Sequence, residues 1–114
     1  MSYDRGVVVW SDDPFKDDAN AGRPWLILNT DLHPFEDEQS MAVALTTSGY
    51  DQALSISSDD WITGGVPYQS YALPWAVHSP QHQYIDQLLG RLTVEFVDRV
   101  VSALESYISP EGPL

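Results

Sequence analysis

The apolar residues of this chain occur in short runs separated by turn-forming residues, and only the last run has the period of a helix. Short runs bounded by glycine, proline, asparagine or aspartate are typical of β-strands. We expect strands at 6–10, 25–29, 41–46, 53–57, 66–78 and 83–89. The 41–46 run is almost wholly apolar, which favours burial on both faces, and Pro74 indicates an edge or a bulge in the long run. The chain is therefore expected to be mainly β.

The C-terminal segment has the pattern of an amphipathic helix. Its apolar residues recur every three or four positions and form one stripe: Val97, Val100, Val101, Leu104 and Ile108. Thr93 is placed to cap the first turn, and the 109–113 segment, rich in proline and glycine, ends the helix. Several short strands followed by one helix predict a small curled β-barrel with a C-terminal α-helix packed against it.

The connections between these segments are polar. Residues 11–22 form an acidic loop and 30–39 a second loop, while 58–61 predicts a single helical turn that Gly64 and Gly65 close. Three of the tryptophans lie within the expected strands, so we expect them in the core: Trp10, Trp25 and Trp75.

Length and composition indicate one domain. At 114 residues, the chain is expected to form a single domain over 1–114. It has no cysteine, which excludes disulfides and cysteine-based metal sites. No apolar run approaches the roughly 18 residues of a membrane span, and the first residues lack the pattern of a signal peptide. We therefore expect a soluble cytoplasmic protein.

The net charge is strongly negative, at −12, and Lys16 is the only lysine. Such acidity usually argues against nucleic-acid binding, since phosphate affinity comes from lysine and arginine. It is also typical of cytoplasmic proteins adapted to high salt, where the Debye length falls to about 3 Å and charge repulsion is screened. The acidity therefore has two interpretations: adaptation of a halophilic protein to its solvent, or a surface that binds a basic partner.

Arg23 occupies a distinctive position, where a turn leads into the apolar run that ends at Asn29. Arginine is scarce here, because Lys and Arg together number 5 against 17 Asp and Glu. A guanidinium is always charged and can bind two oxygens of a phosphate or a carboxylate at once. Arg23 is therefore either a surface arginine paired with a carboxylate or a group that binds an anion.

Three segments, in this order, resemble the start of MazF/PemK-type toxins: Arg5-Gly6-Val7-Val8-Val9-Trp10, then Asp13-Pro14, then Gly22-Arg23-Pro24-Trp25-Leu26-Ile27-Leu28-Asn29. Those toxins open with Arg-Gly-Asp-Val and a hydrophobic strand. A loop follows, and then Gly-x-Arg-Pro or Gly-Arg-Pro ahead of a second hydrophobic strand. Later segments fit the same order, so the resemblance covers nearly the whole chain.

The resemblance implies an SH3-like barrel of the MazF/CcdB type, a homodimer, and cleavage of single-stranded RNA without a metal or cofactor. It also implies an antitoxin protein as partner. In the family, the arginine of the Gly-Arg-Pro motif works with a threonine or serine that ends the third strand. These positions match Arg23 and Thr46 here, with Thr47 as the alternative if the register differs by one residue.

The chain departs from the family after the long strand. Many of these toxins carry Arg-Thr-Ile-Asp there, whereas this chain has Val77-His78-Ser79-Pro80-Gln81. A histidine, with its ordinary pKa near 6.5, suits a general base or acid, although a loop histidine beside an aspartate is the alternative. We expect three catalytic residues: Arg23, Thr46 and His78. We expect three further residues to contact RNA: Thr47, Ser48 and Ser79.

Other side chains of chemical interest have ordinary explanations as well. His78 and His82 are four residues apart, but Pro80 between them argues against a helical metal pair, so we expect no metal site. Tyrosines can stack unpaired bases, but they can equally pack in a core or a dimer interface. The candidates for stacking are Tyr50, Tyr68 and Tyr71.

Two functions therefore remain open. The first is an endoribonuclease toxin of a type II toxin–antitoxin pair, which the Gly-Arg-Pro motif and Thr46 favour. The second is a non-catalytic barrel of the same ancestry that binds a protein, such as an antitoxin-like peptide or a topoisomerase, as CcdB toxins do. The short acidic loop, the missing Arg-Thr-Ile-Asp and the scarcity of lysine favour the second.

Overall fold

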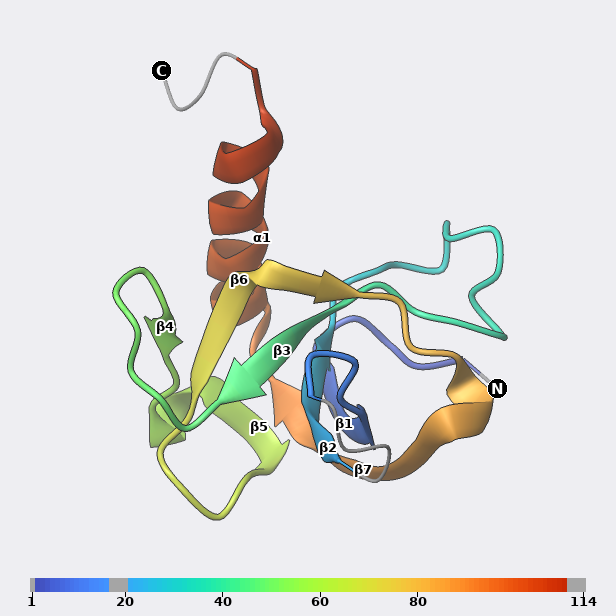
Figure 1. Cartoon of the computed structure of the whole chain (residues 1–114), viewed down its shortest axis with the longest axis horizontal. Coiled ribbons are helices and arrows are strands. Elements are labelled where there is room, and N and C mark those ends of the chain that lie inside the picture. The colour runs from blue at the N-terminus through green and yellow to red at the C-terminus, as the bar shows by residue number, and fades with distance from the viewer. Residues whose placement is uncertain (1, 17–20, 111–114) are drawn as a thin grey trace.

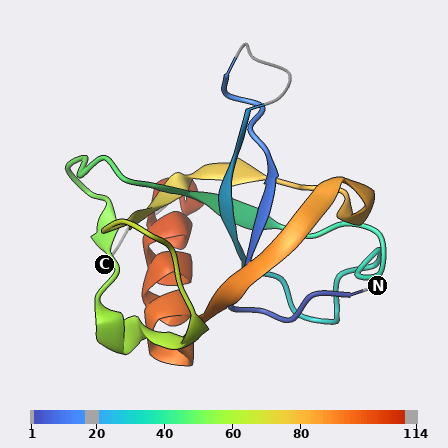
Figure 2. The ribbon, with the colours of Figure 1, turned by 90° about the horizontal axis from the view of Figure 1, so that it is seen from below.

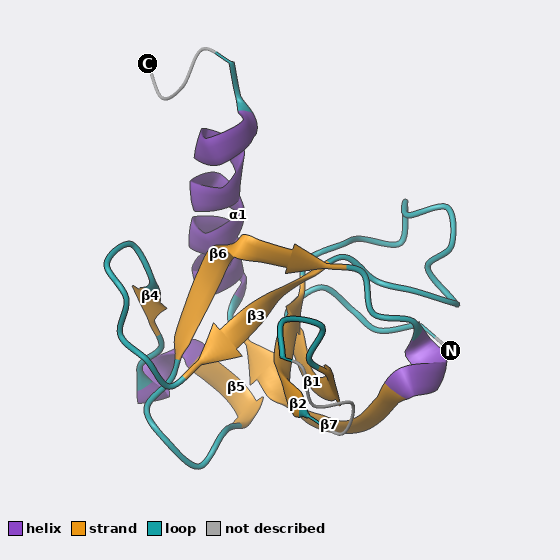
Figure 3. Ribbon diagram, viewed as in Figure 1, coloured by secondary structure: helices purple, strands orange, loops and turns teal. Residues whose placement is uncertain are grey.

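The computed structural model describes residues 2–16 and 21–110. Within them, one curled sheet of seven strands is packed against a C-terminal helix (Figures 1 and 3). The prediction of a mainly β fold with a terminal helix is confirmed. In chain order the elements are β1 (Val7–Asp12), β2 (Gly22–Ile27), β3 (Ala42–Thr46), β4 (Leu54–Ser55), the 3₁₀ turn Ser58–Asp60, β5 (Trp61–Gly64), β6 (Tyr71–His78), the 3₁₀ turn His82–Tyr84, β7 (Ile85–Leu92) and α1 (Val94–Ile108).

The strands are antiparallel and follow the order β4-β6-β3-β2-β1-β7-β5. β1 lies inside the sheet, where Val8 pairs with Leu26 of β2 on one side and with Gly90 of β7 on the other. Figure 2 shows β7 running obliquely across the molecule before the chain enters α1. The sheet curls into a half-barrel in which β1, from the start of the chain, pairs with β7, from near its end.

The two faces of the sheet carry separate apolar clusters because side chains alternate along a strand. Val8 and Leu26 face α1 and pack with its residues Phe96, Val97 and Val100. The next residues along the same two strands, Val9 and Trp25, belong to a second cluster on the other face. The central strands are therefore buried on both sides, as the apolar 41–46 run predicted.

The helix begins where the sequence predicts. The Thr93 hydroxyl accepts a hydrogen bond from the Phe96 backbone N–H at 3.2 Å, which caps the first turn. Val97 and Val100 of the predicted stripe are buried, together with Phe96, which the stripe did not include. Ile108, the last residue of that stripe, is 72% exposed because α1 continues past the edge of the sheet.

Several strand boundaries differ from the prediction; β2 begins at Gly22, so Arg23 lies within the strand rather than in the turn before it. Residues 61–64 form β5 rather than the end of a helical turn, β6 begins at Tyr71 rather than at 66, and β7 runs through Gly90. Gly90 interrupts the apolar run in the sequence, but β5 and β7 approach so closely there that a Cβ on Gly90 would lie 2.5 Å from the Thr63 carbonyl oxygen. The glycine marks close backbone contact within the strand pair rather than its end.

Pro74 lies in a bulge, as expected. β3 advances only from Val43 to Leu45 while β6 advances from Ala72 to Val77, so the extra β6 residues bulge out of the ladder. Trp25 is fully buried, whereas Trp75, beside this bulge, is 44% exposed. The prediction that Trp75 is a core residue is therefore wrong, because the bulge turns it outward.

Candidate functional site

Arg23 and Thr46 lie side by side at one end of the sheet. The β2–β3 register pairs Trp25 with Ala44, and two more residues along each strand place Arg23 next to Thr46. Both residues line two adjoining hollows. One, of about 300 Å³, also contains Trp10, Thr47, Pro67 and Tyr68, and we call it the Tyr68 hollow. The other, of about 550 Å³, also contains Phe15, Tyr50, Leu73 and Trp75, and we call it the Trp75 hollow.

A buried aspartate holds Arg23. The Arg23 Nε–H donates to Asp13 Oδ2 at 2.8 Å, and the Asp13 side chain is 0% exposed while that of Arg23 is 19% exposed. Asp13 Oδ1 accepts a second hydrogen bond from the Phe15 backbone N–H at 2.9 Å. Both carboxylate oxygens are thus satisfied. The sequence contains no sign of this role for Asp13, because it is one of many acidic residues in a loop without periodicity.

The ion pair leaves part of the guanidinium available. Within residues 2–16 and 21–110, the hydrogen bond of Arg23 uses Nε, at the inner edge of the group. The two terminal nitrogens carry four further N–H donors in the same plane. Because Arg23 lines both hollows, these donors can meet an anion placed at their junction.

Thr46 makes a structural contact through its hydroxyl. Its hydroxyl oxygen accepts a hydrogen bond from the Ser48 backbone N–H at 3.2 Å, so it stabilises the turn after β3. A threonine hydroxyl can still donate its own proton to another acceptor. Thr47 lines the Tyr68 hollow with Arg23, whereas Ser48 is exposed and supports Thr46 through its backbone.

His78 lies apart from Thr46. It pairs with Ala42 at one end of β3, whereas Thr46 pairs with Tyr71 at the other end. Four residues of strand separate these two positions by roughly 13 Å. His78 instead lines a third hollow, of about 430 Å³, with Asp12, Asp13, Ser79 and Tyr84, which we call the His78 hollow. The structure thus places the predicted residues His78 and Ser79 together, in a hollow that Asp13 lines and Thr46 does not.

The surroundings of His78 favour its neutral form. Burial lowers the pKa of His78 below its ordinary value of 6.5, while the negative charges of Asp13 and Asp12 act in the opposite direction. Its ring also packs against Trp25, with the centroids 4.9 Å apart. An imidazole that is neutral at pH 7 can accept a proton.

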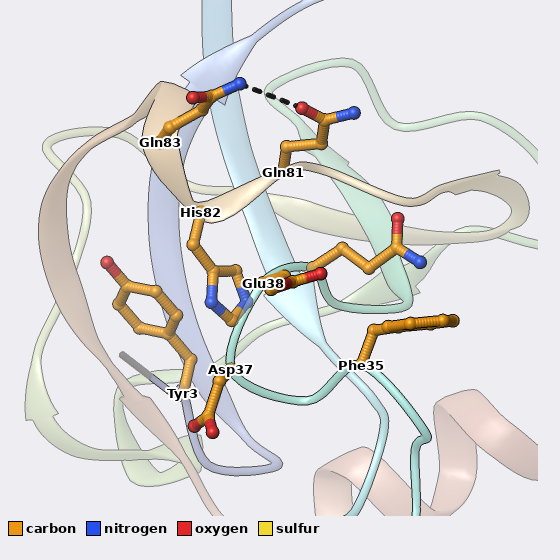
Figure 4. Close-up of a pocket in the computed structure, with 8 residues that line it drawn as sticks. Tyr3, Phe35, Asp37, Glu38, Gln81, His82 and Gln83 are labelled. Carbon is orange, nitrogen blue, oxygen red and sulfur yellow. Dashed lines mark hydrogen bonds between the residues drawn. The ribbon is translucent and has the colours of Figure 1, made fainter.

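His82 belongs to a fourth hollow, of about 720 Å³, which Tyr3, Phe35, Asp37 and several glutamines also line (Figure 4). Its Nε2 hydrogen bonds to the Ser40 hydroxyl at 2.7 Å, and its ring meets Tyr3 edge to face at 4.7 Å. These contacts place His82 away from His78. In the part of the chain that the structure describes, no group of three or more histidine and acidic side chains is arranged to hold a metal ion, and no helix is long and apolar enough to cross a membrane.

Comparison with known proteins identifies the fold. No protein-family model and no curated protein sequence matches the chain. A mycobacterial structure described as an endoribonuclease in complex with its cognate antitoxin matches with a TM-score of 0.72 at 19% identity, over 99% of this chain and 97% of that one. MazF from Deinococcus radiodurans matches with a TM-score of 0.73 at 18% identity, over 95% and 97%.

A MazE–MazF complex from the same organism matches with a TM-score of 0.70 at 16% identity, over 96% of this chain and 97% of that one. These matches cover the sheet and the helix alike, so they extend to the strands that carry Arg23 and Thr46. The resemblance seen in the sequence is thereby confirmed at the level of structure, and the chain has the fold of the MazF-type toxins.

Proposed function

We propose that this protein is the endoribonuclease toxin of a type II toxin–antitoxin pair and that it cleaves single-stranded RNA without a metal. The observation that carries this proposal is the arrangement of Arg23 beside Thr46 at the junction of two hollows, with its guanidinium anchored by a buried carboxylate. The mycobacterial endoribonuclease and the MazE–MazF complex among the matching structures support it.

The reaction is attack of a 2′-hydroxyl on the adjacent phosphorus, in line with the 5′-oxygen. The P–O5′ bond breaks and the departing 5′-oxygen takes a proton from water, which gives a 2′,3′-cyclic phosphate and a 5′-hydroxyl. Negative charge develops on the phosphate oxygens in the transition state, and fixed donors aimed at those oxygens stabilise it. The terminal N–H groups of Arg23 supply such donors, and the Thr46 hydroxyl donates to a phosphate oxygen.

His78 is the group that this proposal assigns to proton transfer. Its lowered pKa keeps it neutral near pH 7, so it can accept the proton of the 2′-hydroxyl as a general base. For this role, the scissile phosphate must lie between the Trp75 hollow and the His78 hollow, so that His78 reaches the 2′-hydroxyl next to the phosphate that Arg23 and Thr46 bind.

Exposed aromatic side chains around Arg23 favour a single-stranded substrate. Phe15 and Tyr50 border the Trp75 hollow and are 57% and 58% exposed, and Tyr68 in the neighbouring hollow is 73% exposed. Unpaired bases stack on such rings, and each stacked base contributes about 1–3 kcal/mol. Stacking of this kind tolerates high salt better than phosphate contacts do, which suits an acidic protein.

Cleavage of a long single-stranded RNA in molar KCl, with EDTA present, tests the proposal. We expect products with 5′-hydroxyl ends. Arg23→Ala should lower the rate about a hundredfold to a thousandfold, since one preorganised donor of charge is lost. Arg23→Lys should restore little, because an ammonium cannot bind two oxygens in one plane. Thr46→Val should have a smaller effect.

Arg91→Ala is the matched control, because it removes the same charge from an exposed ion pair with Asp4. It should cleave like the parent protein. If Arg23→Ala also cleaves like the parent protein, the nuclease resides elsewhere and the proposed site is wrong.

We also propose that the protein is a homodimer, the form in which it would meet its antitoxin. Apolar side chains of β6 and the end of α1 form an exposed patch, which consists of Trp75, Val77, Tyr107 and Ile108. Trp75 and Tyr107 are joined edge to face, with centroids 6.4 Å apart, so the patch is continuous between the two elements. A second copy on this patch would also enclose the Trp75 hollow.

Light scattering in high salt should give twice the chain mass of 12.7 kDa. Ile108→Glu should shift the protein towards monomer, because it places a charge in the apolar interface. Ile62→Glu, at an exposed position on β5, should leave the dimer intact. A parent protein that stays monomeric at micromolar concentration would rule out the dimer.

A further inference from the structure

Asp13 is the most completely enclosed charged side chain next to the proposed site. Its side chain is 0% exposed, Oδ2 accepts from Arg23 Nε at 2.8 Å, and Oδ1 accepts from the Phe15 backbone at 2.9 Å. Its own backbone N–H donates to the Ala21 carbonyl at 3.0 Å, which fastens it between the two ends of the β1–β2 connection. A carboxylate held by these contacts can fix the position of a group that is hydrogen bonded to it.

The bond from Asp13 fixes the direction of the Arg23 donors. A guanidinium is planar and includes Nε, so a hydrogen bond that fixes the Nε–H direction also fixes the plane of the two terminal nitrogens. Arg23 is otherwise a long, flexible side chain that is 19% exposed at the edge of two hollows. Without the carboxylate, the guanidinium would be free to rotate away from their junction.

We propose that Asp13 is the positioning residue of this site: it holds Arg23 by Nε so that the terminal N–H groups face the phosphate to be cleaved. The proposal rests on the proposed function, because it assigns Asp13 a part in that reaction. Asp13 itself does not contact RNA, since both of its oxygens are occupied and its side chain is buried. It acts through Arg23.

A second influence of Asp13 must be separated from this one. Asp13 also faces the His78 hollow, where its charge acts on His78 together with that of Asp12. Lys16 and Tyr84 are the other ionisable groups that line this hollow. A loss of activity on removal of the Asp13 charge could therefore arise through His78 as well as through Arg23.

The pair of variants Asp13→Asn and Asp12→Asn separates the two routes. Asparagine at 13 keeps an oxygen for the Phe15 N–H but loses the charge that binds Arg23. Asp12 is exposed, also acts on His78, and is paired with Arg23 by neither hydrogen bond nor ion pair in the described structure. Both variants should lower the pKa of His78 further, and only Asp13→Asn should release Arg23.

The direct measurement is the NMR signal of the Arg23 Nε–H in the protein without RNA. We expect Asp13→Asn to move this signal and to speed its exchange with water, and Asp12→Asn to leave it unchanged. In the cleavage assay, Asp13→Asn should lose roughly tenfold to a hundredfold, mainly in kcat, as expected for a displaced catalytic group. Asp12→Asn should lose far less, because it can affect the rate only through His78.

Two results would overturn the proposal. An unchanged Nε–H signal in Asp13→Asn would show that Asp13 does not hold Arg23. Equal losses of cleavage in the two variants would assign the effect to His78. If the parent protein cleaves no RNA, the proposed function fails, and the Nε–H signal alone still decides whether Asp13 holds Arg23.

Asp13→Glu covers the case in which Asp13→Asn does not fold. Glutamate keeps the charge and therefore much of its influence on His78, but its longer side chain displaces the carboxylate from Nε. If Asp13 positions Arg23, this variant should lose kcat while the pKa of His78 stays near its parent value. Full activity of Asp13→Glu would contradict it.

Discussion

At the scale of single residues, one buried carboxylate determines the surroundings of two candidate groups. Asp13 binds Arg23 directly and acts on His78 across the hollow that both line. A buried carboxylate is costly unless its oxygens are hydrogen bonded and its charge is compensated. Asp13 meets both conditions through the Phe15 N–H and the Arg23 guanidinium. The two candidate groups are therefore coupled although they occupy different hollows.

The histidine makes stability depend on pH. The pKa of His78 is lowered in the folded protein, chiefly by burial, so the folded state binds fewer protons than the unfolded state as the pH falls below 6.5. Its contribution to stability is thus complete above that value and is lost as the pH falls through the folded pKa. Urea unfolding at pH 7.5 and at lower pH should show this loss. His78→Gln should flatten the dependence, and an unchanged slope in that variant would contradict the assignment.

At the scale of elements, the β5–β7 pair depends on glycine. Gly64 has φ +64°, in the left-handed region, and its backbone lies directly against Leu89 and Gly90 of β7. β5 is also largely exposed, so few side chains hold it in place. Backbone pairing with β7 therefore accounts for most of its attachment.

Gly90→Ala should detach β5. The new Cβ would lie 2.5 Å from the Thr63 carbonyl oxygen, and backbone on both strands must move to accept it. We expect a loss of about 1–3 kcal/mol in the free energy of unfolding, as for other overpacked sites. Urea unfolding measures the loss, and hydrogen exchange locates it in β5. Gly49→Ala is the control, because its Cβ would meet only the Tyr71 side chain at 3.3 Å. Equal stabilities of the two variants would contradict the prediction.

The elements that the sequence predicted correctly are those whose own side chains specify them. Burial of the helix is predicted by the local spacing of the stripe that includes Val97 and Val100. Burial of β3 is predicted by the local apolar run 41–46. β5 has no such period, because it pairs through its backbone with a strand far along the chain. The ion pair between Asp13 and Arg23 was not predicted for a related reason, because it forms only when β1 and β2 are paired. Arg23 and Thr46 were found through family resemblance rather than through any local pattern.

At the scale of the whole molecule, negative charge is in large excess. Each of the four arginines already pairs with a carboxylate: Arg5 with Asp98, Arg23 with Asp13, Arg91 with Asp4, and Arg99 with Asp60. These pairs neutralise only a few of the 17 acidic residues. The remaining carboxylates repel one another at low ionic strength, which destabilises the compact state.

Thermal stability should therefore rise with salt. We expect a higher unfolding midpoint in 2 M than in 0.1 M KCl, because the Debye length shortens from about 10 Å to less than 3 Å. Sucrose at matched osmolality is the control, since it stabilises compact states without screening charge. Equal midpoints in the two KCl concentrations would show that the acidity is not an adaptation to salt. It would then be interpreted as a surface for a basic partner.

The pairing of β1 with β7 has a consequence for synthesis on the ribosome. Val7 pairs with Arg91, so the interior strand β1 lacks one of its two neighbours until nearly the entire described chain has been translated. At about 5–20 residues per second, this delay is on the order of ten seconds. Arg23 and Thr46 emerge early, but the sheet that supports them is completed only when β7 arrives. A nascent chain would thus lack a completed site until β7 has been translated.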